Sequence, residues 1–578
     1  MASYFIGVDV GTGSARASLV NASGKTIASH IQDTITCRDP SDHRIFEQST
    51  TNIWDAVSTC INICLSTSKV DPSSIKGLSF DATCSLAVCD FDMEPIVVTK
   101  GDKLGQKGDR NIILWADHRA EKEADLINST GSVVLEYVGG TMSLEMEIPK
   151  VLWLKKHMSG PLFERCQFFD LPDFLTYRAT ECGSRSCCSV TCKCSFVPMK
   201  GWQAEFFEKI GLKELVDRDY KQLGAANLNV LTAGMPVGNG LSKKAAEEFG
   251  LVEGTPVGSG VIDAYAGWLG TVAARYKENG QLSEAIKNVD ESLGHRLAVI
   301  AGTSTCHIVQ SKDGVFVNGV WGPYKDPVFP GWWMNEGGQS STGQLIDFMI
   351  KSHPAHSKLV ELGKEQEKNI HTVLYDMLQD LKKEANAESL TELTKHMHFY
   401  PDLHGNRSPL ADPRMRGSFV GLALDDGIHD LARKYYLTLE AIALQTRHIV
   451  DEMNLKGHSI ESIYMSGGQA KNILMMQLFA ETCSMPIVLP FDHAGAVVLG
   501  AAMLGRFAAE TQGKKMNEKE QNHLLWNIMV EMTPPGTIIR PAASKREKKL
   551  LEAKYKIFRE QIEIQYRWRK EIEEASKD

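Results

Sequence analysis

Two glycine- and hydroxyl-rich turns, almost three hundred residues apart, constrain this chain most. The first, Gly11-Thr12-Gly13-Ser14, follows the apolar run from Tyr4 to Val10, and the second, Gly302-Thr303-Ser304-Thr305, follows the run from Leu297 to Ile300. In each, a buried strand leads into a turn whose backbone N–H groups and hydroxyls can surround an anion, because no bulky side chain obstructs it. Two such turns in separate halves of one chain indicate a nucleotide triphosphate held between two similar domains.

The other common phosphate-binding motifs do not fit the chain. A dinucleotide fingerprint needs Gly at its sixth position, where this chain has Arg16. The nearest approach to a P-loop, Gly338 to Gly343, continues with Gln344 where the motif requires Lys. The run His118-Arg119-Ala120 lacks the aspartate of a protein-kinase catalytic loop. A strand–turn–strand phosphate clamp remains.

Length and composition favour a globular protein with a small substrate. With 578 residues the chain is too long for one ordinary core, so we expect two domains. A net charge of −9 gives no basic surface for nucleic acid and no attraction to acidic membranes. Thirteen cysteines, an odd number in apolar surroundings, favour a reducing compartment. The start of the sequence lacks a basic segment and no apolar run reaches the roughly 18 residues of a membrane span, so we expect a cytoplasmic protein.

The order of predicted elements indicates an α/β fold. Predicted strands at Tyr4–Val10, Thr26–Ser29 and Gly77–Asp81 alternate with a predicted helix at Thr51–Leu65, whose apolar residues recur every four positions. The polar stretch Lys277–Gly294 reads as a surface insertion. We therefore expect an N-terminal domain at 1–270, the insertion at 271–295, a C-terminal domain at 296–540 and a helix at 541–578.

The expected C-terminal helix is amphipathic. It is dense in charge of both signs from Lys545 onward, but apolar side chains repeat at threes and fours. These are Leu551, Tyr555, Phe558, Ile562 and Tyr566. We expect this face to pack against the protein, and a coiled-coil role stays open.

A third signal is Ser466-Gly467-Gly468, followed by Lys471 and Asn472. A strand that ends in two glycines lets its backbone approach a flat ring, and a helix starting near Lys471 would add its N-terminus. This suits adenine and ribose. A ligand-free turn is the alternative, and the two phosphate turns favour the nucleotide.

Taken together, these segments resemble the actin, Hsp70 and sugar kinase superfamily, and within it the ribulokinase-like branch of the FGGY family of carbohydrate kinases. The resemblance covers about Tyr4 to Gly505. The segments that carry it at branch level are Asp81-Ala82-Thr83-Cys84-Ser85-Leu86, Trp115-Ala116-Asp117-His118-Arg119-Ala120, Pro172-Asp173-Phe174-Leu175-Thr176, Asp263-Ala264-Tyr265-Ala266-Gly267 and Asn335-Glu336-Gly337-Gly338-Gln339-Ser340. The resemblance implies two ribonuclease-H-like domains that close on ATP, Mg²⁺ and a sugar or polyol.

The resemblance implies that Asp263 is the catalytic base, which takes the proton of the attacking hydroxyl. Its position, between the segment Pro256–Ile262 and a predicted helix at Ala264–Tyr276, would otherwise indicate a helix cap. The helix dipole should make Asp263 a weak base, but phosphoryl transfer needs orientation more than basicity.

The ATP and metal contacts follow the three motifs. Asp9, at the end of a buried strand, needs a charged partner, and Mg²⁺ held partly through water suits it. Arg16 either neutralises phosphate or is an ordinary strand arginine. The full set of expected ATP contacts is Asp9, Gly11, Thr12, Gly13, Ser14, Arg16, Gly302, Thr303, Ser304, Gly467, Gly468, Lys471 and Asn472.

Sugar contacts are implied at a loop after a strand, at a lysine and at two acidic residues. These are Ala82, Thr83, Cys84, Ser85, Lys193, Asp263 and Glu336. Without the resemblance, Lys193 would read as a solvated lysine and Glu336 as a residue of a glycine-rich turn. Ribulokinases commonly have His where this chain has Tyr265, which affects substrate preference more than the reaction.

The sequence therefore predicts an ATP-dependent kinase that phosphorylates the terminal hydroxyl of a ketopentose, ribulose before others. Xylulose, ribitol and glycerol are alternative substrates, and a non-catalytic nucleotide switch is the alternative class. The sequence does not decide between a monomer and a homodimer. The cluster from Cys182 to Cys194 lacks paired CxxC spacing and is better explained by buried thiols lining a strand than by zinc.

Overall fold

The computed structural model describes residues 3–284, 286, 289–291, 293–492 and 495–577. The chain forms two compact units, and each unit contains several segments of chain. Unit 1 comprises Met1–Ala298, Ile308–Glu336 and Pro490–Thr537. Unit 2 comprises Val299–His307, Gly337–Leu489 and Ile538–Asp578. The predicted α/β class is confirmed.

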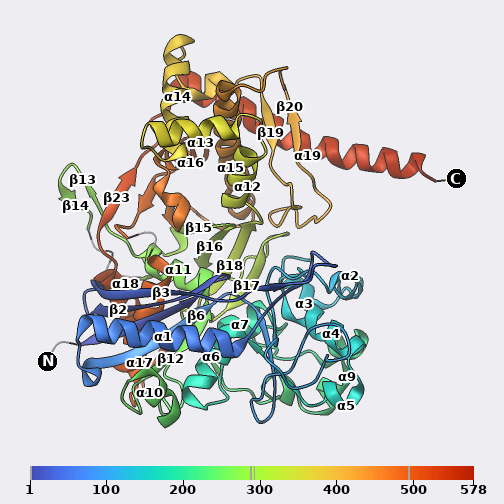
Figure 1. The fold of residues 1–578 in the computed structure, drawn as a ribbon, viewed down its shortest axis with the longest axis vertical. Coiled ribbons are helices and arrows are strands. Elements are labelled where there is room, and N and C mark those ends of the chain that lie inside the picture. Colours follow the sequence, from blue (N-terminus) through green and yellow to red (C-terminus); the bar gives the residue numbers. More distant parts are fainter. Residues whose placement is uncertain (1–2, 285, 287–288, 292, 493–494, 578) are drawn as a thin grey trace. The chain divides into compact units, whose positions relative to one another are not determined.

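The central sheet of unit 1 has the strand order β12-β6-β1-β2-β3 (Figure 1). Its members are β1 (Tyr4–Val10), β2 (Ser14–Asn21), β3 (Thr26–Asp33), β6 (Ile75–Ala82) and β12 (Val257–Ile262). The strands β1, β6 and β12 run parallel, and β1 and β2 form an antiparallel hairpin around the first turn. The apolar side chains of Phe5, Ile6, Val8 and Val10 on β1 are buried, as a strand covered on both faces requires, while Asp9 is partly exposed.

Two helices pack against this sheet. Helix α1 (Thr50–Ser68) begins at Ser49, whose side chain accepts a hydrogen bond from the Asn52 N–H, and it buries the apolar stripe predicted from its four-residue spacing. Helix α17 (Ala496–Thr511) packs closely on β1 at Gly7. A Cβ at Gly7 would lie 2.0 Å from the carbonyl oxygen of Val498, so only glycine permits this approach.

A second sheet of unit 1 has the order β4-β5-β8-β7-β9. Its strands are β4 (Cys37–Arg38), β5 (Phe46–Gln48), β7 (Leu86–Asp90), β8 (Ile112–Ile113) and β9 (Cys166–Asp170). Residues 83–85 connect β6 of the first sheet to β7 of the second, so this loop stands where the two sheets meet. Helix α6 (Leu171–Thr180) follows β9, α7 (Cys187–Cys192) lies farther along the chain, and α11 (Asp263–Val272) follows β12. Helix α11 ends four residues earlier than the sequence pattern predicts.

The polar stretch at 277–294 begins with an exposed hairpin. Strand β13 (Tyr276–Glu278) pairs with β14 (Gln281–Leu282) and, on its other side, with β23 (Gly536–Ile539). Leu293 near the end of the stretch is fully buried. Residues 285, 287–288 and 292 of this stretch lie outside the described residues.

In unit 2, strands and parts of strands follow the order β22-β21-β15-β16-β18. Their bounds are β15 (Arg296–Ala301), β16 (Thr305–Ser311), β18 (Trp333–Gln339), β21 (Ser462–Ser466) and β22 (Ile487–Leu489). The second turn joins β15 to β16, as the first joins β1 to β2. Helices α12 (Gly343–Lys351), α14 (Ile370–Glu384), α15 (Ile428–Leu455) and α16 (Ile473–Cys483) belong to this unit.

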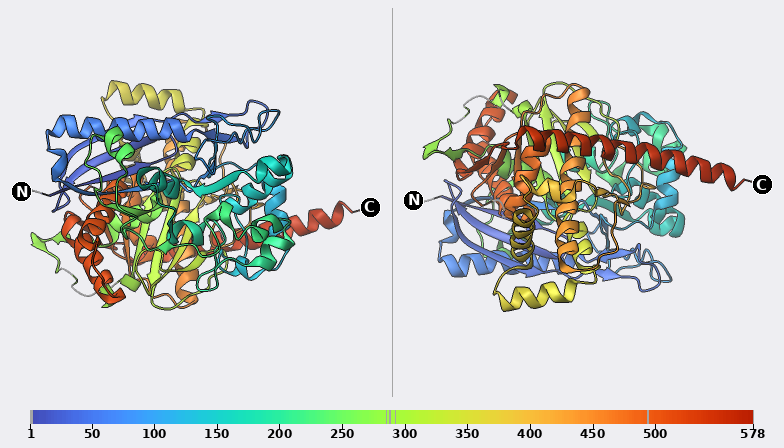
Figure 2. Two further views of the ribbon diagram at one scale, coloured as in Figure 1. Left: turned by 90° about the horizontal axis from the view of Figure 1, so that it is seen from below. Right: turned by 90° about the horizontal axis from the view of Figure 1, so that it is seen from above.

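The C-terminal segment forms one long helix, α19 (Lys545–Ala575). Its first half buries Leu551, Tyr555, Phe558 and Ile562 against unit 2, while Tyr566 is exposed. The last turns extend past strands β19 (His398–Tyr400) and β20 (Ser418–Val420), as Figures 1 and 2 show. Among the described residues, no helix combines the length and the apolar character that crossing a membrane requires.

Candidate active site

The first turn is held by hydrogen bonds from its base while its tip stays open. The Gly11 N–H donates to the Ser14 carbonyl at 2.9 Å, which closes the turn. Gln48 Nε2 donates to the Thr12 carbonyl at 2.8 Å, and Trp115 Nε1 donates to Thr12 Oγ1 at 3.0 Å. Gly13 is exposed at the tip. The turn is therefore preorganised and accessible, as an anion cradle must be.

The second turn, in unit 2, is built in a similar way. The Gly302 N–H donates to the Ser304 carbonyl at 2.8 Å, and the Thr303 carbonyl accepts from the Thr342 N–H at 3.0 Å. Gln469 Nε2 donates to Thr342 Oγ1 at 2.8 Å and also to the Gly302 carbonyl. Gln469 thus connects the phosphate turn to the segment that the sequence assigns to adenosine.

That segment borders a cavity of about 940 Å³ within unit 2. Gly468, Lys471 and Asn472 line the cavity, together with side chains of α14, α15 and α16. Gly467 has φ +93°, and a Cβ there would lie 2.3 Å from the Ala301 carbonyl oxygen, so this position requires glycine. A cavity of this size can enclose a nucleoside.

Asn472 has two structural roles at the cavity wall. Its Oδ1 accepts from the Met475 N–H at 3.2 Å and caps α16, and its Nδ2 donates to the Tyr435 hydroxyl at 2.8 Å. The helix expected near Lys471 therefore begins as a 3-10 turn at Gly468–Lys471, and α16 starts at Ile473.

Three acidic residues gather on one face of the central sheet in unit 1. Asp9 on β1 lies in register with Asp81 on β6 and with Arg16 on β2. Burial raises the pKa of Asp9, which Arg16 partly offsets. Burial, with Asp9 and Asp263 nearby, raises the pKa of Asp81 well above its usual range. These carboxyl groups hold less negative charge than three exposed aspartates would.

Asp263 is the first residue of α11, directly after β12. Its Oδ1 accepts a hydrogen bond from the Ala264 N–H at 2.7 Å. Burial is the largest effect on this group, and with the nearby charge of Asp9 it raises the pKa of Asp263 to about 7. The expectation of a weak base is therefore wrong, because burial and like charge outweigh the helix N-terminus. A carboxyl with this pKa is suited to general base catalysis near neutral pH.

The loop at residues 83–85 joins this acidic face to the first turn. The Thr83 N–H donates to the Val10 carbonyl at 3.0 Å, and the hydroxyls of Thr83 and Ser85 lie 3.1 Å apart. Trp115 donates its backbone N–H to Ser85 Oγ at 3.2 Å. Because the Trp115 ring also bonds Thr12, this one residue connects the sugar loop predicted from sequence to the phosphate turn.

Lys193 and Glu336 lie together in unit 1, and both are buried. Lys193 follows α7, and its Nζ lies 4.1 Å from the ring centre of Trp321 on β17 (Trp321–Lys325). Trp321 is the register partner of Glu336 on β18. Lys193 is therefore not a solvated lysine, and Glu336 lies in a strand and not in a turn. The strand continues through Gly337 and Gly338, where a Cβ would lie 3.0 Å from the Ile449 side chain and 2.7 Å from the Arg407 side chain.

The structure thus brings the predicted site residues into two groups. Unit 1 contains Asp9 to Arg16, Ala82 to Ser85, Lys193, Asp263 and Glu336, and unit 2 contains Gly302 to Ser304 and Gly467 to Asn472. Sequence reasoning gave no role to Asp81, Trp115, Trp321 or Gln469. Asp81 and Trp115 each begin a segment on which the family resemblance was based, so a signal was present.

The cysteine cluster forms part of a helix and not of a strand. Cys187, Cys188 and Cys192 lie on α7, which is buried on every side. A short helix without an exposed face has no helical periodicity, and its sequence resembles a buried strand. Cys192 Sγ lies 3.1 Å from the hydroxyl of Tyr265, the residue that differs from the ribulokinase pattern.

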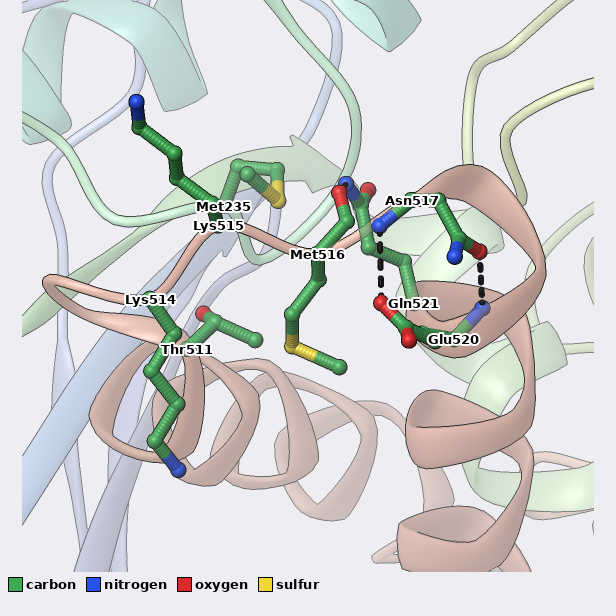
Figure 3. Close-up of a pocket in the computed structure, with 8 residues that line it drawn as sticks. All are labelled: Met235, Thr511, Lys514, Lys515, Met516, Asn517, Glu520 and Gln521. Atoms are coloured by element: carbon green, nitrogen blue, oxygen red, sulfur yellow. Dashed lines mark hydrogen bonds between the residues drawn. The ribbon is translucent and has the colours of Figure 1, made fainter.

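Another cavity, of about 540 Å³, lies in unit 1, and none of the predicted site residues line it (Figure 3). It lies beside helix α18 (Glu518–Met532). Two of its polar side chains, Asn517 and Glu520, bond each other's backbone N–H groups in a capping box. These hydrogen bonds cap the N-terminus of the helix, so the two side chains have a structural role.

Comparisons with known proteins identify the family of the chain. Residues 4–270 match the N-terminal domain, and residues 297–509 the C-terminal domain, of the FGGY family of carbohydrate kinases. A D-ribulokinase of Saccharomyces cerevisiae is 45% identical over 523 residues, which cover 88% of this chain and 72% of that protein. An FGGY carbohydrate kinase domain-containing protein of Homo sapiens is 41% identical over 97% of this chain and 96% of its own. A crystal structure of a xylulose kinase from Rhodospirillum rubrum superposes with a TM-score of 0.74 at 18% identity, covering 98% of this chain and 99% of that one.

Proposed function

The chain belongs to the FGGY family of carbohydrate kinases, and from this premise we propose that it phosphorylates the terminal hydroxyl of a ketopentose, with ribulose as its preferred substrate. The products would be ribulose 5-phosphate and ADP. Membership of the family makes the protein a phosphotransferase that uses ATP. The choice of sugar is the proposal.

The observation that carries the proposal is the chemistry around Asp263. Its pKa of about 7 allows it to accept a proton at neutral pH, and the charges of Lys193 and Glu336 act on it, so these groups share one neighbourhood. As the hydroxyl oxygen of the sugar forms a bond to the γ-phosphorus, the bond to the β-phosphate oxygen breaks and ADP leaves. The hydroxyl proton passes to the carboxylate of Asp263.

The polar groups around Asp263 favour a substrate with several oxygen atoms. Thr83 and Ser85 supply hydroxyls, Lys193 supplies an ammonium and Glu336 a carboxylate, and all four side chains are buried. Buried polar groups that a substrate leaves without partners cost free energy, so such a pocket discriminates strongly against smaller molecules. A three-carbon polyol offers fewer oxygen atoms to these groups than a ketopentose does, so we expect it to be a poorer substrate. The relative named D-ribulokinase supports ribulose among the ketopentoses.

The nucleotide contacts are proposed at the two turns and at the cavity of unit 2. The backbone N–H groups and hydroxyls of residues 11–14 and 302–304 would bind phosphate oxygens. Gly467, Gly468, Lys471 and Asn472 would contact adenosine, with the glycine backbone close to the flat base. Arg16 would offset phosphate charge from its position beside Asp9.

The residues beside the first turn fit Mg²⁺. Asp9 and Asp81 offer carboxylate oxygens, the ligands that this ion prefers, and Asp81 has buried oxygens without a hydrogen-bond donor. Among the described residues, no three His, Cys, Asp or Glu side chains are close enough to hold a metal alone. This agrees with Mg²⁺, which is usually bound by one or two carboxylates with waters and substrate phosphates. When bound, Mg²⁺ neutralises charge on the phosphate oxygens.

The test is ADP release measured with ribulose, xylulose, ribitol, glycerol and gluconate. We expect ribulose to give the highest kcat/KM. Asp263→Asn should keep ATP binding and lower kcat by roughly 10² or more. Glu336→Ala should lower kcat/KM for ribulose by about 1–3 kcal/mol of transition-state binding.

Three results would contradict the proposal at different levels. A preference for glycerol or gluconate would refute the ketopentose assignment while leaving the kinase intact. Normal turnover in folded Asp263→Asn would remove this residue from the mechanism. ATP hydrolysis that is slow and has the same rate with and without each sugar would favour a nucleotide switch.

A further inference from the structure

Asp81 is a buried acidic residue to which the sequence assigns no role and which the proposed function places only near the magnesium site. It is 0% exposed, and neither of its carboxylate oxygens receives a hydrogen bond from any donor in the described part of the chain. Burying a carboxylate without such donors is costly, and the cost falls when the group is protonated or meets an opposite charge or a bound cation. Asparagine or serine could fill the same space without this cost. Asp81 is the register partner of Asp9, so one cation at this position could meet both carboxyl groups.

The position of Asp81 in the sheet shows where that cation would lie. Arg16, Asp9 and Asp81 are register partners on the adjacent strands β2, β1 and β6, so their side chains project from one face. Val261 on β12 continues this row as the partner of Asp81. Asp263 follows Val261 by two residues, immediately after the strand.

The charges along this row are unevenly distributed. Arg16 is the register partner of Asp9, whereas Asp81 lies between Asp9 and Val261, two residues before Asp263. Arg16 thus lies on the far side of Asp9 from Asp81. A positive charge placed beside both Asp9 and Asp81 would reduce the repulsion between these two carboxylates.

We propose that Asp81 is a second carboxylate ligand, beside Asp9, for the divalent cation that accompanies ATP, binding it directly or through one water molecule. This inference rests on the Mg²⁺ requirement of the proposed function. In it, Asp81 sets the position of the cation relative to the first turn, and Asp9 alone does not complete the site. Asp263 stays available to accept the proton of the sugar hydroxyl.

The test measures metal binding directly, without sugar and without turnover. Mn²⁺ is titrated into the full-length protein at about pH 8, and the free ion is followed by electron paramagnetic resonance. We expect Asp81→Asn to weaken Mn²⁺ binding about 10–100-fold, the range found when groups that hold or orient metal ligands are removed. Asp81→Ser should have the same effect, and it tests the inference if the asparagine variant does not fold.

The matched control is Asp173→Asn in the same unit. Asp173 is also buried, and burial raises its pKa to about 7, but it accepts its hydrogen bond from the Ser186 N–H and lies outside the row. This variant should bind Mn²⁺ like the wild type. Equal losses in Asp173→Asn and Asp81→Asn would overturn the inference, because a general effect on the fold would explain both.

Thermal unfolding supplies a second readout. Without divalent cations, Asp81→Asn should unfold at the same temperature as the wild type or higher, because the Asp81 oxygens accept no hydrogen bond in the described part of the chain that the substitution could remove. Adding Mg²⁺ should raise the unfolding temperature of the wild type and have little effect on the variant. The reverse pattern would contradict the inference.

The outcomes also separate this inference from the proposed function. If folded Asp81→Asn binds Mn²⁺ as tightly as the wild type does, the proposed role of Asp81 is refuted and the proposed function is not. Failure of the wild type to bind Mn²⁺, with or without ADP, would refute the metal requirement itself. The identity of the sugar affects neither result.

Discussion

The buried ammonium of Lys554 leads to a quantitative prediction for helix α19. Its Nζ lies 2.6 Å from Glu440 Oε2 on α15, and both side chains are almost fully buried. The same ammonium donates to the carbonyls of Thr394 at 2.8 Å and Met397 at 3.1 Å. Lys554→Met would keep most of the apolar stem and remove the charge, leaving the Glu440 carboxylate buried without its partner.

The expected loss of stability follows from the buried Glu440 carboxylate that is left without its cation. Removing one partner of a buried ion pair costs about 3–5 kcal/mol. For a domain of 150–250 residues, each kcal/mol lowers the unfolding temperature by roughly 2–4 °C, so we expect a fall of about 6–20 °C. Part of this loss of stability should disappear in acid, because Glu440 becomes neutral when it takes up a proton.

The direction of the pH effect can be derived from the pKa of Glu440. Burial raises the pKa of this carboxyl and Lys554 lowers it, so without Lys554 its folded pKa should lie well above the unfolded value of about 4.3. A carboxyl with a raised folded pKa binds more protons in the folded state than in the unfolded state. The variant should therefore lose stability as pH rises from about 4.3 to the folded pKa, by up to about 1.4 kcal/mol per pH unit.

The assay is urea and thermal unfolding at about pH 5 and pH 7.5. Lys556→Met, on the exposed face of the same helix, should stay within about 0.5 kcal/mol of the wild type. Adding Glu440→Gln to Lys554→Met should recover part of the loss at the higher pH. A loss below about 1 kcal/mol at pH 7.5, or one that does not change with pH, would refute this reasoning.

Three further predictions concern Asp263, the glycine turn at Gly467 in unit 2, and the core of unit 1. Because Asp263 must be ionised to accept a proton and its pKa is about 7, kcat/KM should fall as pH drops below about 7, and a profile that is flat down to pH 5 would contradict the assignment. Gly467→Ala places a Cβ 2.3 Å from the Ala301 carbonyl oxygen, so ADP binding measured by calorimetry should weaken at least about tenfold, and unchanged affinity would show that the turn can move freely. Gly7→Ala should push α17 off β1 and give insoluble or heat-labile protein, whereas soluble protein with wild-type unfolding would mean that the helix shifts at little cost.

The fold class was predictable because its strongest signals are local. An apolar run followed by a glycine turn identifies β1 and its hairpin, and the four-residue spacing of Ile53, Val57 and Ile61 identifies α1. Helix α7 and the strand position of Glu336 were not predictable in this way. Both lie in surroundings buried on every side, where no exposed face leaves a period in the sequence.

The electrostatics of the site depend on contacts between distant segments. The sequence placed Asp263 at a helix N-terminus, which alone would lower its pKa. The pairing of β12, β6 and β1 brings Asp263, Asp81 and Asp9 together; burial then raises the pKa of all three, and like charge adds to this for Asp81 and Asp263. Asp81 and Asp9 lie about 180 and 250 positions before Asp263, and local sequence reasoning does not include them.

Strand β1 is synthesised first, but helix α17, which packs on it, is synthesised near the end of the chain. About 490 residues separate the two elements, so at roughly 5–20 residues per second translation takes about 25–100 s to supply the helix. Throughout that interval the apolar face around Gly7 has no native partner and is available to chaperones or to other nascent chains. A gene fragment that ends near residue 298 would leave it uncovered permanently, since residues 490–537 complete the same unit. For the same reason, the two halves that the family models divide at about residue 297 should not yield separately soluble proteins.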